Sequence, residues 1–294
     1  MRTLVNVLAL LIVIAVAVPV AGSNVLWYDV QNGTGVDTQL YTYDLATGLT
    51  TDRGSVPGVQ LMTNFAFGAP GQIYGVGWNN LNGGGNGNLY AITLGTGGAA
   101  NSYTALQIQG GGISGSPNGI VYANNAIFVS TWDQQFYKLV SANDGSNNWT
   151  VAAQGSMGYG AVGGMAFGPG GQLYAEMMNG NNTQLATVNL AEGSGFGQAT
   201  LVGGAVSSTQ ILEGLSNING TLYASLLTGD FGDSTLVTID PTTGTTTFVA
   251  DLGNGVWGMA YDSPIGLAPT PEPTTLGLFG AGLIGMVFVR RRKK

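Results

Sequence analysis

The chain has 294 residues, of which 50 are glycine, 44% are hydrophobic and only 8% are charged, with a formal net charge of −7. Disorder needs few apolar residues and high charge, and collagen needs a strict Gly-X-Y period, so the sequence excludes both. Cysteine and histidine are absent, which excludes disulfides, thiolate sites, His-ligated zinc and a Ser-His-Asp triad. A loop-rich all-β protein is therefore predicted.

The N-terminus has the order of a secretory signal peptide. Arg2 precedes an apolar run at 7–18, and the small residues Ala, Gly and Ser follow at 21–23. The apolar run is too short for a convincing membrane span, and the small residues suit a cleavage site. We predict a signal helix over residues 1–23, with the mature chain beginning near Asn24.

Basic side chains are almost absent between the two ends of the chain. Residues 24–270 contain only Arg53 and Lys138 against fourteen Asp and Glu. A nucleic-acid surface needs clustered Lys and Arg to neutralise phosphates. The sequence therefore excludes nucleic acid as a partner. An acidic surface rich in Asn, Gln, Thr and Ser suits cation or sugar contacts instead.

Two columns of residues repeat along the mature chain with one common period. The first column, in one predicted strand of each unit, has spacings of 47, 54, 46 and 49 residues. Its members are Trp27, Tyr74, Phe128, Tyr174 and Tyr223. The second column, in the next predicted strand, comprises Tyr41, Tyr90, Tyr137, Ala186 and Val237. A period of about 40–50 residues with four short strands per unit is typical of a β-propeller blade.

The first strand of the repeat is displaced in one unit. The segments FAF at 65–67, MAF at 165–167 and MAY at 259–261 match one another, whereas the first unit lacks this strand and the last copy has no unit after it. We therefore predict a five-bladed β-propeller over residues 24–266, in which the C-terminal strand completes the first blade. A β-sandwich would not need equal units, and a solenoid would not move one strand to the far end.

Turn residues support the same division into strands. Asp44 to Gly48 and Asp240 to Gly244 lie between the third and fourth strands of the first and fifth units. An Asp side chain accepts from the backbone two residues further on, and Gly supplies a positive φ. These Asp residues are therefore predicted to form turns rather than to bind ligands.

The longest polar loops are expected between the second and third strands, on one face of the propeller. Trp78 and Trp132 share a repeat position there, and Asp133 and Asn179 belong to the same set of loops. Exposed Trp beside Asn and Asp is a usual arrangement for stacking on sugars, so these four residues are the predicted ligand site. A Trp at a repeat position can equally pack between blades.

Two carboxylates share the repeat position that lies two residues after the first column. They are Asp29 and Glu176. Glycoside hydrolysis uses paired carboxylates, which makes these the candidate catalytic residues of a glycan-acting enzyme. They would approach each other only across the ring, and isolated polar positions on strands are commoner than catalytic ones.

One loop contains a candidate metal site. Asp230 and Asp233 offer two carboxylates near backbone carbonyls in the fifth unit, and calcium takes such oxygen ligands. The spacing is not that of an EF-hand, and a short Asp-Gly turn explains the residues equally well. No other cofactor is predicted.

The C-terminus has three parts in a fixed order. A Pro-rich linker at 267–273 ends in Pro271, Glu272 and Pro273, and a helix with an apolar segment and a basic tail is predicted over 274–294. Its apolar part reaches about 24 Å, short of a hydrocarbon core of roughly 30 Å, which suits a temporary membrane hold. This arrangement resembles the PEP-CTERM sorting signal of Gram-negative bacteria.

The resemblance implies a cellular route. It implies processing by an exosortase near the Pro-Glu-Pro, transient retention in the inner membrane, and export to the cell surface or an extracellular polysaccharide matrix. An ordinary C-terminal anchor would also place the domain outside the cell. Whether the helix is removed or retained stays open.

Three functions agree with these features. The first is a non-catalytic surface or matrix protein whose propeller binds extracellular polysaccharide or another surface protein. The second is a glycan-acting enzyme that uses Asp29 and Glu176. The third is a purely structural component of the exopolysaccharide layer or biofilm. The sequence favours the first and third over the enzyme, because it holds so few catalytic residue types.

Overall fold

A computed structural model describes residues 24–31, 37–68, 72–78, 87–95, 101–109, 112–142, 147–179, 182–206, 210–229 and 232–261. The regular elements of these ranges are strands, apart from a short 3-10 turn at Pro169–Gly171. No helix among these residues is long and apolar enough to cross a membrane. The predicted signal helix, the Pro-Glu-Pro linker and the C-terminal helix lie outside the described residues.

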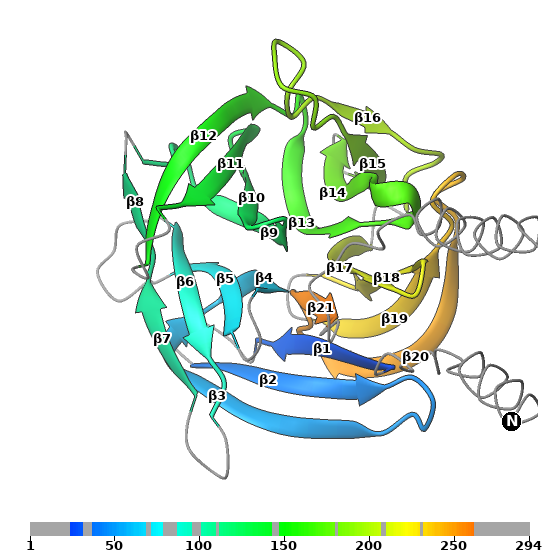
Figure 1. Cartoon of the computed structure of the whole chain (residues 1–294). Helices are drawn as coiled ribbons and strands as arrows, with labels where there is room; N and C mark the ends of the chain where they lie inside the picture. The colour runs from blue at the N-terminus through cyan, green and yellow to red at the C-terminus, as the bar shows by residue number, and fades with distance from the viewer. Residues whose placement is uncertain are drawn as a thin grey trace, which may run out of the picture.

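The strands form five separate sheets that follow one another around a common axis (Figure 1). Blade 1 contains β21 (Met259–Tyr261), β1 (Val25–Val30), β2 (Asp37–Asp44) and β3 (Thr50–Gln60). Blade 2 contains β4 (Met62–Phe67), β5 (Gln72–Trp78), β6 (Gly87–Thr93) and β7 (Ser102–Ala105). Blade 3 contains β9 (Pro117–Ala123), β10 (Ala126–Thr131), β11 (Gln135–Ser141), β12 (Asn148–Ser156) and β8 (Gln107–Gln109).

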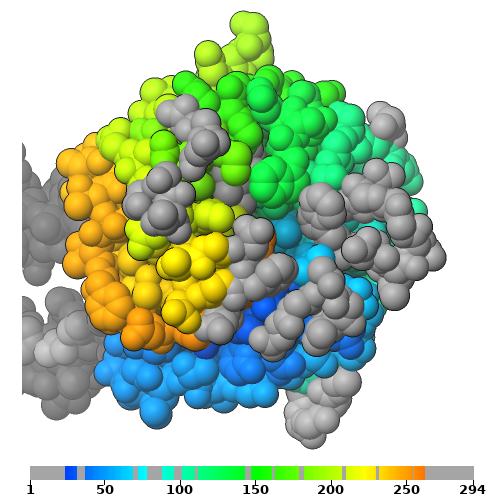
Figure 2. Space-filling view, turned by 180° about the vertical axis from the view of Figure 1, so that it is seen from behind, coloured from blue at the N-terminus to red at the C-terminus, as the bar shows by residue number. Residues whose placement is uncertain are grey.

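Blade 4 contains β13 (Gly160–Phe167), β14 (Leu173–Asn179), β15 (Asn182–Val188) and β16 (Ala199–Leu201). Blade 5 contains β17 (Ile211–Ile218), β18 (Thr221–Leu227), β19 (Asp233–Ile239) and β20 (Thr246–Asn254). Seen from the far side, the blades succeed one another around the disc in chain order (Figure 2). The domain is a five-bladed β-propeller, as the period predicted.

Blade 1 is assembled from both ends of the described chain. Strand β21 pairs antiparallel with β1, with Trp27 opposite Ala260. The inner strands β21, β4, β9, β13 and β17 each contact the next around the axis, and β17 contacts β21 again. The predicted closure is confirmed: the C-terminal strand completes the first blade and leaves no gap between blades 5 and 2.

The aromatic column has the same register in every blade. Its members lie opposite the corresponding position of the inner strand in the pairs Trp27–Ala260, Tyr74–Ala66, Phe128–Val121, Tyr174–Ala166 and Tyr223–Ser216. Successive strand residues point to opposite faces of a sheet. Each column aromatic therefore faces one neighbouring blade, and the residue after it faces the other.

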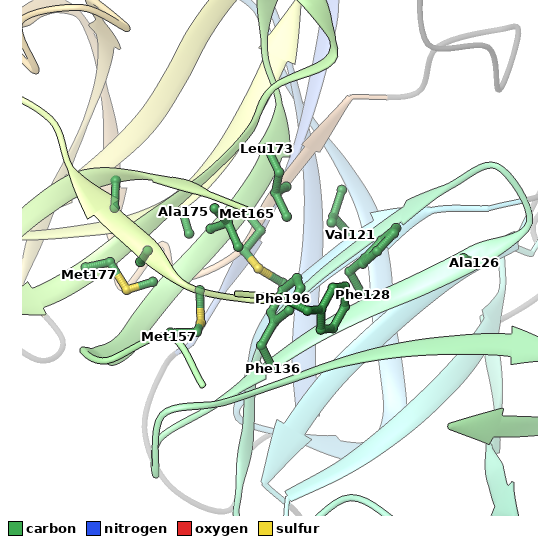
Figure 3. Packing of buried hydrophobic residues seen from close by; sticks show 13 residues of the cluster. Val121, Ala126, Phe128, Phe136, Met157, Met165, Leu173, Ala175, Met177 and Phe196 are labelled. Carbon is green, nitrogen blue, oxygen red and sulfur yellow. The ribbon is translucent and has the colours of Figure 1, made fainter. Parts of the chain in front are cut away.

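Packing between blades forms the core. Five clusters of buried apolar side chains lie at the five junctions between consecutive blades. At the junction of blades 3 and 4, Phe128, Phe136 and Phe196 meet the sulfur-bearing side chains of Met157 and Met165 (Figure 3). The repeat period thus reflects one packing requirement that every blade must satisfy.

The two predicted turns are confirmed in atomic detail. Asp44 Oδ1 accepts hydrogen bonds from the N–H groups of Ala46 and Thr47 at 2.8 and 3.1 Å. Asp240 Oδ1 does the same for Thr242 and Thr243 at 2.7 and 3.1 Å. The glycine that ends each turn has φ near +70°. These two carboxylates are used by the backbone, as expected of turn formers.

Blade 3 differs from the prediction of four strands per unit. The connection from blade 2 forms β8, which pairs in parallel with the outer strand β12, and Ile108 opposes Trp149. The N–H of Leu106 still donates to the carbonyl of Leu89 in blade 2 at 2.9 Å. The outer edge of a sheet has unpaired backbone N–H and C=O groups. In blade 3 the connection from blade 2 pairs with part of this edge as β8. Periodicity does not reveal this pairing, because among the described residues only blade 3 has it.

Candidate functional site

Trp132 lies at the tip of a tight hairpin between β10 and β11. This hairpin belongs to the face of the propeller that carries the loops between the second and third strands of each blade, here called the loop face. The Trp132 side chain is 36% exposed, and its backbone N–H donates to the carbonyl of Ser116 at 3.0 Å. Asp133 is exposed beside it, and its Oδ1 accepts from the hydroxyl of buried Thr131 at 2.5 Å. These two hydrogen bonds fix the turn that carries the indole, and part of the indole ring faces solvent.

The other predicted ligand residues occupy the same end of their blades. Trp78 is the last residue of β5, opposite Gly87, and Asn179 is the last residue of β14, opposite Asn182. The side chains of Trp78 and Asn179 lie outside the described residues. The structure thus confirms that these positions belong to one set of hairpins, and the shared ligand site stays a prediction.

The predicted metal residues of blade 5 are only partly described. Asp233 begins β19 and is exposed, and its carbonyl accepts a hydrogen bond from the N–H of Thr228 at 3.0 Å. Asp230 lies outside the described residues, as does the Pro271-Glu272-Pro273 sorting motif. In the described ranges no group of three or more His, Cys, Asp or Glu side chains is placed to hold a metal ion.

Asp29 is fully buried on β1, where it faces the inner strand of its own blade. Its Oδ1 accepts hydrogen bonds from the backbone N–H groups of Trp257, at 3.2 Å, and of Gly258. Removal from water disfavours the ionised form and outweighs these donors and the nearby Gln31 side chain, so burial raises the pKa of Asp29 to about 8. The carboxyl group joins the last strand of the ring to the first.

Glu176 repeats this arrangement in blade 4. It is fully buried on β14, and its Oε2 accepts a hydrogen bond from the N–H of Gly164 on the inner strand at 2.6 Å. Burial again dominates and raises the pKa of Glu176 to about 8. Blade 5 lies between Asp29 and Glu176 in the ring. Their use as a catalytic pair stays a prediction.

Sequence reasoning missed a third buried carboxylate, Glu213 on β17, which is 2% exposed. A Cβ atom added to Gly163 would lie 2.1 Å from Glu213 Oε2 and 2.9 Å from Glu176 Oε2, so the two oxygens are at most about 5 Å apart. Glu213 precedes Gly214 as Gly163 precedes Gly164 and Trp257 precedes Gly258. Aligning the inner strands on this glycine is the signal that would have found it.

Replacing Asp29 by Asn is expected to reduce the pH dependence of stability. Between the ordinary pKa of 3.8 and the folded-state pKa of about 8, folded Asp29 keeps a proton that the unfolded chain has lost. The free energy of unfolding therefore falls as the pH rises through this window, by about 1.4 kcal/mol per pH unit for one group. Asn still accepts both N–H groups but does not ionise, so the contribution of Asp29 to the slope is removed while that of Glu176 remains.

Urea unfolding at pH 5, 6, 7 and 8 measures the effect. Asp233→Asn serves as the matched control, because that carboxylate is exposed and should leave the wild-type slope unchanged. Identical slopes for the wild type and Asp29→Asn would show that Asp29 is already ionised when the protein is folded.

The C-terminal residues match a known sorting motif. The PEP-CTERM protein-sorting motif matches residues 269–293. The chain carries a PEP-CTERM sorting signal. The signal indicates an exported protein, and it implies processing by an exosortase at the membrane. Among curated proteins, none matches the chain significantly.

Several solved structures are similar to the chain at low sequence identity. A chain of a nidogen/laminin complex is 14% identical, with a TM-score of 0.48 over 80% of this chain and 97% of that one. A putative 6-phosphogluconolactonase of Bacteroides fragilis is 12% identical, with a TM-score of 0.47 over 79% and 82%. A periplasmic gluconolactonase of Pseudomonas aeruginosa is 12% identical, with a TM-score of 0.46 over 78% and 82%.

Proposed function

We propose that this exported propeller is a non-catalytic surface or matrix protein whose loop face binds extracellular polysaccharide. The observation that carries the proposal is Trp132, a partly exposed indole on a braced hairpin beside the exposed Asp133. Such a ring offers a flat apolar face next to hydrogen-bonding groups, which is the chemistry that a sugar ring needs.

Charge narrows the class of polysaccharide. Residues 24–270 carry fourteen acidic and two basic side chains, so the domain repels polyanions at low salt. Neutral glycans are therefore the favoured ligands, and another surface protein is the alternative partner. The complete burial of Asp29 and Glu176 supports a binding role over glycan cleavage, because a polymer would have to reach carboxyl groups that have no exposed surface.

Binding of the purified protein to neutral matrix polysaccharide should weaken about tenfold or more in Trp132→Ala, because central Trp residues dominate many interfaces. The double variant Trp78→Ala, Trp132→Ala is expected to bind more weakly still. Phe248→Ala is the matched control, since Phe248 is 62% exposed on the outer strand β20, away from the loop face.

Each result of this experiment has a distinct meaning. Unchanged binding by the double variant would remove both Trp residues from the site. If even the wild type shows no saturable binding, a purely structural matrix component is favoured. Sugar release by the wild type that is lost in Glu176→Gln would favour the enzyme.

A further inference from the structure

Two carboxyl groups from neighbouring blades meet beside a residue that has no side chain. Glu176 comes from β14 in blade 4, Glu213 comes from β17 in blade 5, and Gly163 lies between them on β13. The Oε2 atoms of both Glu residues lie within 3 Å of the point where a Cβ of Gly163 would stand. Any larger residue at 163 would therefore fill the space that the carboxyl groups share.

Neither basic side chain of the described residues lies at this place. Arg53 and Lys138 are the only Lys and Arg between residues 24 and 270. The Arg53 guanidinium lies 5.4 Å from the centre of the Trp27 ring, and Lys138 pairs with Glu192 at 3.1 Å. Two buried carboxylates at most about 5 Å apart repel each other strongly. A cation bound between them would keep both ionised.

Further oxygen atoms lie near Gly163. The Ser130 side chain is 1% exposed, and its hydroxyl has no hydrogen-bond partner among the described residues. This hydroxyl lies 2.5 Å, and the carbonyl oxygen of Gly163 lies 2.6 Å, from the point where a Cβ of Gly119 would stand. The Ser130 hydroxyl, which has no described partner, therefore lies near the Gly163 carbonyl on β13. Glu176 Oε1 also has no partner in the described part of the chain.

The chemistry of these atoms selects one class of ligand. They are all oxygens, comprising two carboxylates, a main-chain carbonyl and a hydroxyl. Calcium takes six to eight oxygen ligands in flexible geometry and retains water where the protein supplies fewer, whereas magnesium demands a near-ideal octahedron. Two carboxylates balance the two charges of such an ion. An exported protein also works outside the cell, where weak calcium sites are common.

We propose that the propeller axis binds one calcium ion between Glu176 and Glu213, with the Gly163 carbonyl and the Ser130 hydroxyl completing the oxygen set. This site is separate from the loop residues Asp230 and Asp233. It joins β10 of blade 3, β13 and β14 of blade 4 and β17 of blade 5, and it does not depend on polysaccharide binding at the loop face. Calcium therefore stabilises the ring itself.

The test uses the purified full chain after treatment with EDTA. Equilibrium dialysis should find one calcium ion bound per chain, and the Tm should rise with calcium concentration, because the folded state alone presents the site. Glu176→Gln combined with Glu213→Gln should weaken calcium binding at least about tenfold, the cost of losing charged metal ligands. Asp230→Asn combined with Asp233→Asn is the matched control and should bind calcium as the wild type does.

Three results would overturn the proposal. One is the absence of bound calcium together with a Tm that calcium does not change, which would mean that protons neutralise the pair. Another is equal affinity in the Glu176, Glu213 double variant, and the third is loss of binding in the Asp230, Asp233 control. If the double variant does not fold, Ser130→Ala decides. It keeps both carboxylates, so reduced calcium affinity in it supports the site and unchanged affinity counts against it.

Discussion

A chain that ends at Asn254, and therefore lacks β21, is expected to lose its cooperative unfolding transition. Val256, Met259 and Ala260 are buried between blades 5, 1 and 2, and burial of a Val or Met side chain is worth about 1.5–3 kcal/mol. The truncation also removes both N–H donors of Asp29 and leaves the edge of β1 unpaired. A typical domain has only about 5–15 kcal/mol of stability, so this loss takes most of it.

Thermal and urea unfolding, followed by circular dichroism and Trp fluorescence, measure this effect. The matched control ends at Gly266, which keeps β21 and removes only the residues that follow the predicted domain. The control should unfold in one sharp transition, and the shorter chain should unfold gradually and aggregate through its open edge. Equal transitions for the two chains would show that the ring does not need its last strand.

Replacing Gly164 by Ala is expected to destabilise the domain by about 3 kcal/mol, which lowers the Tm by roughly 6–12 °C. The added Cβ would lie 1.8 Å from the backbone nitrogen of Leu215 on the next inner strand. A backbone atom cannot turn aside as a flexible side chain can, so blades 4 and 5 must separate. The N–H of Gly164 is also the donor to Glu176, which couples the same shift to the buried carboxyl group.

Gly204→Ala is the control for this substitution. A Cβ on Gly204 would have no atom within 4 Å, so the change should leave the Tm within about 1–2 °C of the wild type. Both variants add one methyl group, and they differ only in what surrounds it. A Gly164→Ala protein as stable as Gly204→Ala would mean that the inner strands are further apart than the structure places them.

The repeat pattern predicted most of the architecture, because every blade meets the same physical demand. Each column aromatic must fill the junction with a neighbouring blade, so its position recurs with the blade. The displaced strand at 259–261 predicted closure for a similar reason, since a blade without its inner strand would leave a gap in the ring. The Asp44 and Asp240 turns were predictable because their chemistry is local.

Features that occur in one blade could not be predicted from the repeat pattern. The pairing of β8 with β12 occurs only in blade 3, and Glu213 has no acidic counterpart at the same position of another inner strand. Asp29 and Glu176 were found as a column, but their complete burial was not predicted. Whether a polar residue faces solvent or a neighbouring strand depends on how closely the inner strands approach, and spacing along the chain does not contain that distance.

The sequence by itself determined the number of blades, the strand that closes the ring and the export route. Repeated packing positions and sorting signals both depend on the order of residues along the chain, so they can be recognised without the structure. Only the tertiary structure decided that three carboxyl groups are buried beside the inner strands and that two of them meet at Gly163. Glu176 and Glu213 are 37 residues apart in the chain. They become neighbours because glycines allow the inner strands to pack backbone against backbone, which brings polar groups of successive blades to one axis.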